Sequence, residues 1–546
     1  MEPGDDDDQA EVRRAAFGEQ GLAAVDTRKS QALRRARAGF SPAQAPVAMA
    51  RSRVRRDYPP SGAAQARAGG QEHPACPTLS VGSCRHALVD RAENARLFEC
   101  EQGIKGQFDA IVPALQEIAA LGRSADFPRR AQEVARERLG FELPPVPLER
   151  AWIRGPDIRA LYAEATFSAL SGAVARFADR IRMEAAERTL DAMLVGFGFH
   201  AMNVSNCSDG RLKGVLPYIL RLPASSLLHR RGFAGALFNV EDDVQHWEHM
   251  ELRRFREGFP TTVDSQSRYL KVAVYHRSSV DPAHEGCAAH GSNDRAAADA
   301  ALARLQEFRE AIENTFCCGA STDILLIGVD TDTDAIRVHV PDANGDISAY
   351  RYVDNATLYR DTLGLDADRA RLAVYDAIAA LGAAQGWGHG AGMPHDGMRR
   401  LIATLLINNM SQIEYVTEYH GGWYADRGHG ERFMNVGDAF QEVQVRNVAY
   451  YARMDTVEEG APDLDVGVKI FRSLNIERGL PIPMVLHYRF DAQIPGSRAR
   501  VETKIRRVAE AIRGRYAALV EQGWLYLRGS IQDIPLGSPL EEVVLT

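Results

Sequence analysis

The stretch Asn203–Arg211 constrains this chain most, because it places a thiol, a carboxylate and a guanidinium at alternate positions. On extended backbone, residues two apart point to the same side, so Cys207, Asp209 and Arg211 could face one cavity. The residues before Cys207 are apolar enough for a buried strand, and open α/β sheets carry their chemistry at the carboxyl ends of strands. A thiolate there favours a soft or borderline metal such as zinc. Since a single cysteine is often only a small buried hydrophobe, the stretch alone leaves both interpretations open.

Two further metal ligands are expected downstream. Val272–Arg277 has the pattern of a buried strand, and His276 stands near its end. Cys287 follows in a loop ahead of residues 295–316, where apolar residues recur at helical spacing. Together with Cys207 these residues form a Cys2His set. Three protein ligands leave tetrahedral zinc one open position, which is typical of a catalytic zinc site.

The sequence around these residues resembles a known family. Cys-x-Asp-x-Arg followed far downstream by histidine and cysteine resembles the site of β-class carbonic anhydrases. The distance from His276 to Cys287 is a departure, because two residues separate these ligands in the usual β-class pattern. The stretches FHAMNVSNCSDGRLKGVLPYILRLP and YHGGWYADRGHGERFMNVGDAF resemble a divergent branch, the carboxysome shell carbonic anhydrases. The likeness runs from about Glu93 to the C-terminus.

The resemblance implies a zinc enzyme, carbonic anhydrase (a lyase), that hydrates CO2 reversibly to bicarbonate. One Zn2+ per chain is held by Cys207, His276 and Cys287, and zinc hydroxide is the nucleophile. Asp209 orients the hydroxide, and Arg211 keeps Asp209 ionised and out of the metal's coordination shell. The implied location is the lumen or inner shell face of the carboxysome, a bacterial cytoplasmic microcompartment, where CO2 is supplied to Rubisco. The alternative is a catalytically weak or regulated zinc scaffold that links Rubisco to the shell.

Histidines near glycines are candidates for moving the proton that the reaction releases. His429 lies between Gly428 and Gly430 and is our first choice as a further catalytic residue; the alternative is a histidine that only shapes a turn. His284 and His290 flank Cys287, where each could support the metal site or compete as a ligand.

Composition excludes several classes of protein. The 546 residues carry a net charge of −8, so the molecule as a whole is not a nucleic-acid binder. We find no apolar run of about 18 residues, so no membrane span is expected. The seven cysteines, in a chain without an export signal at its start, indicate reduced thiols or metal ligands and no disulfide framework. A zinc alcohol dehydrogenase would need a dinucleotide-binding fingerprint and a zinc deaminase a Pro-Cys-x-x-Cys motif; neither is evident.

The predicted fold is α/β (α+β) in four parts. Residues 1–90 form a disordered, largely basic tail for binding Rubisco and shell or scaffold proteins. Residues 91–184 form a helical domain, and residues 185–430 a β-carbonic-anhydrase-like zinc domain. Residues 431–546 form a degenerate second copy without zinc. The two copies are expected to pair as β-class subunits do, and a homodimer or higher homo-oligomer is expected.

The second copy is inferred from a short internal echo. Met484–Arg489 has the pattern of a strand that contains His487 and precedes a helix, as Val272–Arg277 does. No cysteine follows Cys318, so this half cannot build a cysteine-ligated zinc site, and His487 is interpreted as a core histidine.

Other elements are predicted from apolar runs and turn residues. Residues 237–240 and 323–329 have strand patterns. The run Asp330–Asp334 lacks the glycine and glutamate of a calcium-binding loop and is predicted to be a hairpin turn.

Overall fold

The computed structural model describes the chain from Arg85 to Leu545, except residues 123–124, 146, 149–156, 181–182, 224, 226, 259–267, 317–321, 343, 385–395, 426–429, 455–456 and 536. The predicted tail, apart from its last residues, lies outside the described part. The chain divides into two compact units. Unit 1 contains Glu184–Cys207 and Ile219–Tyr424, together with the described residues up to Asp90. Unit 2 contains Arg91–Met183, Ser208–Tyr218 and Ala425–Thr546. The boundary between the units therefore falls directly after Cys207.

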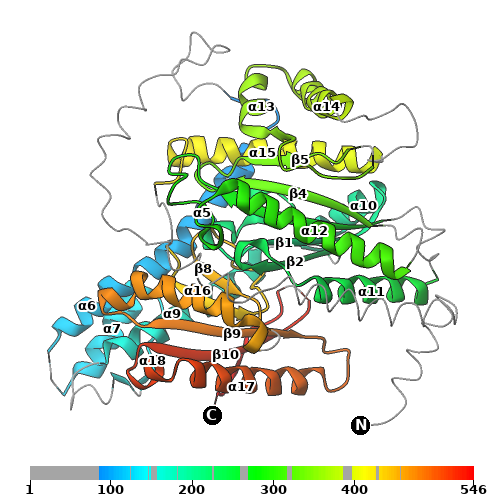
Figure 1. The fold of residues 1–546 in the computed structure, drawn as a ribbon. Coiled ribbons are helices and arrows are strands. Elements are labelled where there is room, and N and C mark those ends of the chain that lie inside the picture. The colour runs from blue at the N-terminus through cyan, green and yellow to red at the C-terminus, as the bar shows by residue number, and fades with distance from the viewer. Residues whose placement is uncertain are drawn as a thin grey trace, which may run out of the picture. The chain divides into compact units, whose positions relative to one another are not determined.

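Unit 1 is built on a six-stranded sheet (Figure 1). The strand order is β2-β1-β3-β4-β5-β6; the first four strands are parallel, and the last two continue antiparallel. The strands are β1 (Phe199–Cys207), β2 (Leu228–Phe233), β3 (Arg268–Arg277), β4 (Thr322–Asp330), β5 (Ile336–His339) and β6 (Tyr352–Asp354). The helices are α10 (Met183–Gly196), α11 (Val240–Arg256), α12 (Asp294–Phe316), α13 (Asn355–Thr362), α14 (Ala367–Ala384) and α15 (Asp396–His420).

Two inner strands of this sheet are buried over their whole length. Every residue of β1 and β4 is buried, as expected for parallel strands that are covered on both faces. Helix α12 packs on β3 and β4 through apolar residues at helical spacing, including Leu305, Phe308 and Ile312. The helix predicted at 295–316 and the strands predicted at 272–277 and 323–329 are confirmed.

One predicted strand is wrong. Residues 237–240 follow a 3-10 turn (Ala234–Ala236) and lead into α11, which begins at Val240. The strand of this region is β2, an edge strand whose residues are mostly half-buried. This strand contains Arg230 and Arg231, so its sequence has no apolar run that would predict a strand.

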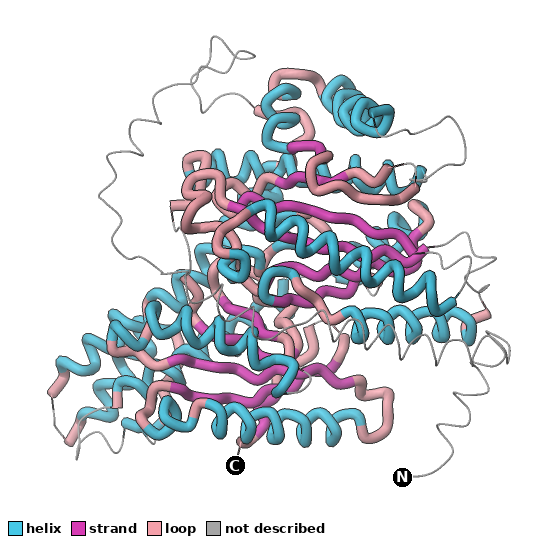
Figure 2. The backbone as a smooth tube through the Cα atoms, in the orientation of Figure 1, coloured by secondary structure: helices cyan, strands magenta, loops and turns pink. Residues whose placement is uncertain are grey.

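Unit 2 contains a five-stranded sheet in the order β11-β10-β9-β7-β8, with β11 antiparallel and the other strands parallel. The strands are β7 (Phe433–Gly437), β8 (Ala449–Ala452), β9 (Ile482–Phe490), β10 (Leu525–Asp533) and β11 (Glu541–Val543). The helices are α5 (Arg91–Asp109), α6 (Ile111–Ala120), α7 (Phe127–Leu139), α9 (Ile158–Arg180), α16 (Val457–Leu474), α17 (Ser497–Arg515) and α18 (Ala517–Glu521). Figure 2 shows the helices of each unit beside its strands.

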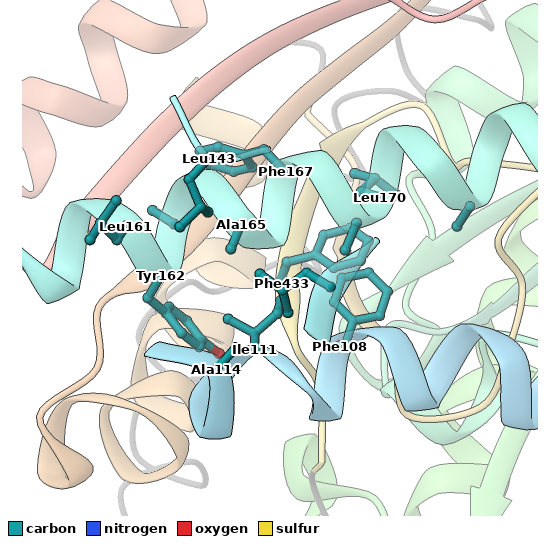
Figure 3. Packing of buried hydrophobic residues seen from close by; sticks show 14 of the residues in the cluster. Phe108, Ile111, Ala114, Leu143, Leu161, Tyr162, Ala165, Phe167, Leu170 and Phe433 are labelled. Carbon is teal, nitrogen blue, oxygen red and sulfur yellow. The ribbon is translucent and has the colours of Figure 1, made fainter. Parts of the chain in front are cut away.

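Alternate residues of the unit 2 strands enter two separate cores, because successive side chains on a strand point to opposite faces. Phe433 belongs to the core formed with helices α5, α6, α7 and α9, and its ring stacks on Phe108 with 5.8 Å between centroids (Figure 3). Met434 belongs to the core that α16 and α17 cover on the other face. The N-terminal helices are thus packed as one layer of unit 2.

The two sheets share strand order and direction. β8, β7, β9, β10 and β11 follow the same sequence of parallel and antiparallel pairings as β2, β1, β3, β4 and β5. The observed architecture is thus mixed α/β, with N-terminal helices and two sheets rich in parallel strands, which confirms the predicted class at that level. None of the helices in the described ranges combines the length and apolarity that a membrane span requires.

Candidate metal centre

Cys207, His276 and Cys287 meet at one edge of the unit 1 sheet. Cys207 is the last residue of β1, and His276 is the last but one of the neighbouring strand β3. Parallel strands end on the same edge, which brings these side chains together. One potential ligand atom from each of the three residues lies within 4.8 Å of the others, and all three residues are buried. In the part of the chain that the structure describes, this is the group of His, Cys and acidic residues that could hold one ion.

The distance between the two sulfur atoms suits zinc. The Sγ atoms of Cys207 and Cys287 are 4.0 Å apart, about twice the length of a disulfide bond. When two thiolates bind the same tetrahedral zinc ion, each at about 2.3 Å, their sulfurs lie about 3.8 Å apart. Two thiolates and one imidazole are also the donor types that zinc prefers. The three residues therefore fit a zinc ion in donor chemistry and in spacing.

The loop between His276 and Cys287 is fixed by the turn after β4. One carboxylate oxygen of Asp332 accepts hydrogen bonds from the Ser278 hydroxyl at 2.6 Å and from the backbone N–H of Val280 at 2.8 Å. Asp330 forms an ion pair with Arg277 at 3.0 Å. The acidic run thus forms the predicted hairpin turn and also holds the segment that leads to Cys287. The sequence pattern predicts the turn, but nothing in it indicates this second role.

The residues next to Cys287 bend the chain tightly. A Cβ atom on Gly286 would lie 2.9 Å from the Cα atom of Ser292, so only glycine fits directly before Cys287. The carbonyl oxygen of Cys287 accepts hydrogen bonds from the N–H groups of His290 and Ser292, each at 3.0 Å. Ser292 has a φ of 62°, a left-handed conformation that non-glycine residues adopt rarely. The thiol is therefore presented from a closed turn.

Asp209 and Arg211 form a buried, forked ion pair within unit 2. The guanidinium donates from Nε to Oδ1 of Asp209 at 3.0 Å and from an Nη atom to Oδ2 at 2.7 Å. The backbone N–H of Arg211 also donates to Oδ1, at 2.9 Å. Three charge-assisted hydrogen bonds fix the plane of the carboxylate. Along the chain, Asp209 follows the candidate ligand Cys207 by two residues.

The other candidate residues have different outcomes. His284 is 61% exposed and pairs with Asp281 at 2.9 Å, so it does not belong to the metal group. His290 is not a member of the group either. His290 nevertheless lies near the group. Burial lowers the pKa of His290, while the charge of Cys207 raises this pKa and that of His276 lowers it. His429 and the vicinal pair Cys317–Cys318 lie outside the described residues.

Three family models match successive parts of this chain. They are described as the N-terminal domain (residues 86–178), the catalytic domain (189–429) and the C-terminal domain (430–546) of Carboxysome Shell Carbonic Anhydrase. The chain belongs to the carboxysome shell carbonic anhydrase family. Within this family it is 52% identical to the carboxysome shell carbonic anhydrase of Halothiobacillus neapolitanus (strain ATCC 23641 / c2) over 477 residues, which is 86% of this chain and 92% of the relative.

More distant members of the family match over similar lengths. The carboxysome shell carbonic anhydrase of Prochlorococcus marinus (strain MIT 9313) is 47% identical over 83% of this chain and 88% of its own length. That of Hydrogenovibrio crunogenus (strain DSM 25203 / XCL-2) is 39% identical over 84% and 86%. The residues matched by the family models therefore include both sheets, the N-terminal helices and the group of Cys207, His276 and Cys287.

Proposed function

We propose that this chain is a zinc carbonic anhydrase that interconverts CO2 and bicarbonate. The observation that carries the proposal is the buried group of Cys207, His276 and Cys287, whose ligand atoms lie within 4.8 Å of one another in a member of a carbonic anhydrase family. One zinc ion per chain is the cofactor that this donor set favours. The three side chains leave a fourth tetrahedral position for the reaction.

Zinc bound by these ligands would act as a Lewis acid that acidifies water, so that it attacks CO2 as hydroxide. Asp209, held as a carboxylate by Arg211, would accept a hydrogen bond from the hydroxide. This bond would orient a lone pair of the hydroxide oxygen toward CO2. The same carboxylate disfavours competing ligands that carry no proton. Arg211 would also prevent Asp209 from turning toward the metal and closing the open position. We assign the release of the proton to His429.

The proposed location is the carboxysome, since the relatives are named carboxysome shell carbonic anhydrases. There the reaction would run toward CO2 and supply it to Rubisco. The basic tail within residues 1–90 is the proposed attachment to Rubisco and to shell or scaffold proteins. A homodimer or higher homo-oligomer remains the proposed assembly.

We further propose that residues 431–546 are a degenerate second copy of the zinc domain at 185–430. The shared strand order and direction of the two sheets supports this proposal. In the second sheet, His487 is fully buried and stacks on Phe440, with 4.1 Å between ring centroids. No cysteine lies beyond Cys318, so this part of the chain cannot build a cysteine-ligated zinc site.

The alternative function is a zinc scaffold with little catalysis of its own. The variant Asp209→Ala separates the two, because the carboxylate is not a ligand in the proposed site. Stopped-flow CO2 hydration should collapse in this variant while its zinc content stays at one per chain. Zinc-loaded wild-type protein without hydratase activity would instead support the scaffold.

A further inference from the structure

The segment that carries Asp209 and Arg211 is docked on the C-terminal part of the chain within unit 2. Gly210, between the two catalytic candidates, donates its N–H to Oε1 of Glu431 at 3.1 Å. Its carbonyl oxygen accepts a hydrogen bond from the N–H of Asn447 at 2.9 Å. The backbone N–H and the carbonyl oxygen of Gly210 are thus both hydrogen-bonded to residues more than 200 positions away in the sequence.

Close packing makes this contact specific. A Cβ atom on Gly210 would lie 2.5 Å from Oε1 and 2.6 Å from Cγ of Glu431, nearer than real Cβ contacts allow, so alanine here would force the Glu431 side chain to move. Glu431 is 3% exposed, and Gly210 is buried. Asn447 has a φ of 56°, the left-handed conformation, and this bend directs its N–H to Gly210.

Two more contacts continue the docking along the segment. The Lys213 ammonium lies 5.1 Å from the ring centroid of Tyr451, on strand β8. A Cβ atom on Gly214 would lie 2.7 Å from the carbonyl oxygen of Gln444, so glycine is required at this position too. The segment Ser208–Tyr218 is therefore fitted to residues 431–451 at three successive points.

We propose that Glu431 is a positioning residue for the hydration reaction: it holds Gly210 and thereby sets the orientation of the Asp209–Arg211 pair. This inference rests on the proposed function of that pair. It gives the zinc-free C-terminal part a role in catalysis, since Glu431 and Asn447 belong to the part matched by the C-terminal family model. Neither residue ligates the metal or touches the substrate in this account.

The test compares Glu431→Ala with Glu431→Gln. Alanine removes the acceptor of the Gly210 N–H, and kcat per bound zinc should fall roughly 10- to 100-fold, the range found for partners that orient metal-site groups. Zinc content should stay at one per chain. Glutamine keeps a carbonyl oxygen at the same place and should restore most of kcat. Equal losses in the two variants, or full activity in Glu431→Ala, would overturn the proposal.

Glu442→Ala is the matched control, because Glu442 is also a buried glutamate of unit 2 that accepts a hydrogen bond, from Gln532 at 2.8 Å. Hydrogen–deuterium exchange supplies a readout that needs no catalysis. Peptides covering residues 208–214 should exchange faster in Glu431→Ala and remain as in the wild type in Glu442→Ala. Unchanged exchange in Glu431→Ala would contradict the docking.

Gly210→Ala approaches the same contact from the other side and covers the case that Glu431→Ala does not fold. The added Cβ should lower kcat when Glu431 is present. It should lower kcat much less when it is added to Glu431→Ala, because the effects of residues in contact are not additive. Additive losses would refute direct coupling. A wild-type protein that binds zinc without hydrating CO2 would instead refute the proposed function, whereas the exchange results would stand.

Discussion

The sulfur atoms of Cys207 and Cys287 lie 4.0 Å apart although the two residues are 80 positions apart in the chain. The distance is far too long for a disulfide and near that expected for two thiolates on one zinc. Strand β1 supplies one thiol and a closed turn supplies the other. Strand and turn together therefore hold the two sulfurs at a distance that one zinc ion could span.

Replacing Arg211 by lysine should disable catalysis without loss of metal. Lysine keeps the positive charge but cannot donate the two parallel hydrogen bonds that Asp209 accepts from the guanidinium. We expect kcat to fall on the order of 100-fold, as misplacement of a reacting group by about 1 Å can cause. Stopped-flow hydration and zinc analysis on the same sample check this. Unchanged kcat in Arg211→Lys would show that charge alone is sufficient.

Replacing Asp332 by alanine should loosen the hold on zinc. The variant removes the acceptor of Ser278 and of the Val280 N–H, which restrain the loop leading to Cys287. Zinc affinity should fall roughly 10- to 100-fold, as for other groups that orient metal ligands. The measurement is the rate of zinc transfer to a chromophoric chelator.

Asp334→Ala is the control for the Asp332 variant. Asp334 stands in the same turn, is also buried, and accepts hydrogen bonds from Gln412 and Tyr424, which lie away from the ligand loop in the sequence. Its loss should affect stability more than zinc transfer. Equal acceleration of zinc transfer in both variants would argue against a specific role for Asp332.

The stability of the protein should fall below neutral pH, partly because of His487. Burial lowers the pKa of His487 to about 3, so its imidazole stays neutral when folded, whereas an unfolded histidine has a pKa near 6.5. Between these values the unfolded state binds more protons, so stability decreases as pH falls. The group contributes about 2 kcal/mol of this loss between pH 7 and pH 5.

His487→Gln isolates this contribution. Glutamine is polar but does not titrate, so the loss of unfolding free energy between pH 7 and pH 5 should be smaller than in the wild type by about 2 kcal/mol. Denaturant unfolding curves at the two pH values give the comparison. The same pH dependence in both proteins would show that His487 titrates normally when folded.

Removing residues 1–84 should separate attachment from catalysis. Residues from Arg85 onward remain. They include His86, whose backbone N–H donates a hydrogen bond to Glu414 and whose ring is hydrogen-bonded to Thr362. The truncated protein should keep its zinc and its kcat, but fewer copies should be found in purified carboxysomes. Full packaging of the truncated chain would contradict the proposed role of the tail.

The sequence could predict that Cys207, His276 and Cys287 come together, because each stands at a local signal. Cys207 and His276 stand at or near the ends of strands whose residues are almost all buried, and Cys287 lies between the second strand and a regular helix. Such patterns depend only on neighbouring residues. The strand at 228–233 escaped prediction because an edge strand with half-buried arginines has no such pattern.

The support around the site could not be predicted in this way. Glu431 contacts Gly210 across 221 positions, and no spacing rule relates two such residues. The absence of a side chain at Gly210 is meaningful only when the carboxylate beside it is known. The second role of Asp332 was equally hidden, since a hairpin turn already explained why the residue is acidic.

The decisive experiment for the zinc site is stopped-flow CO2 hydration with zinc counted in the same purified sample, for the wild type and Cys207→Ala. We expect one zinc per chain and fast hydration in the wild type, with both lost in Cys207→Ala. Undiminished hydration in Cys207→Ala, or one zinc per chain without hydration in the wild type, would contradict this expectation.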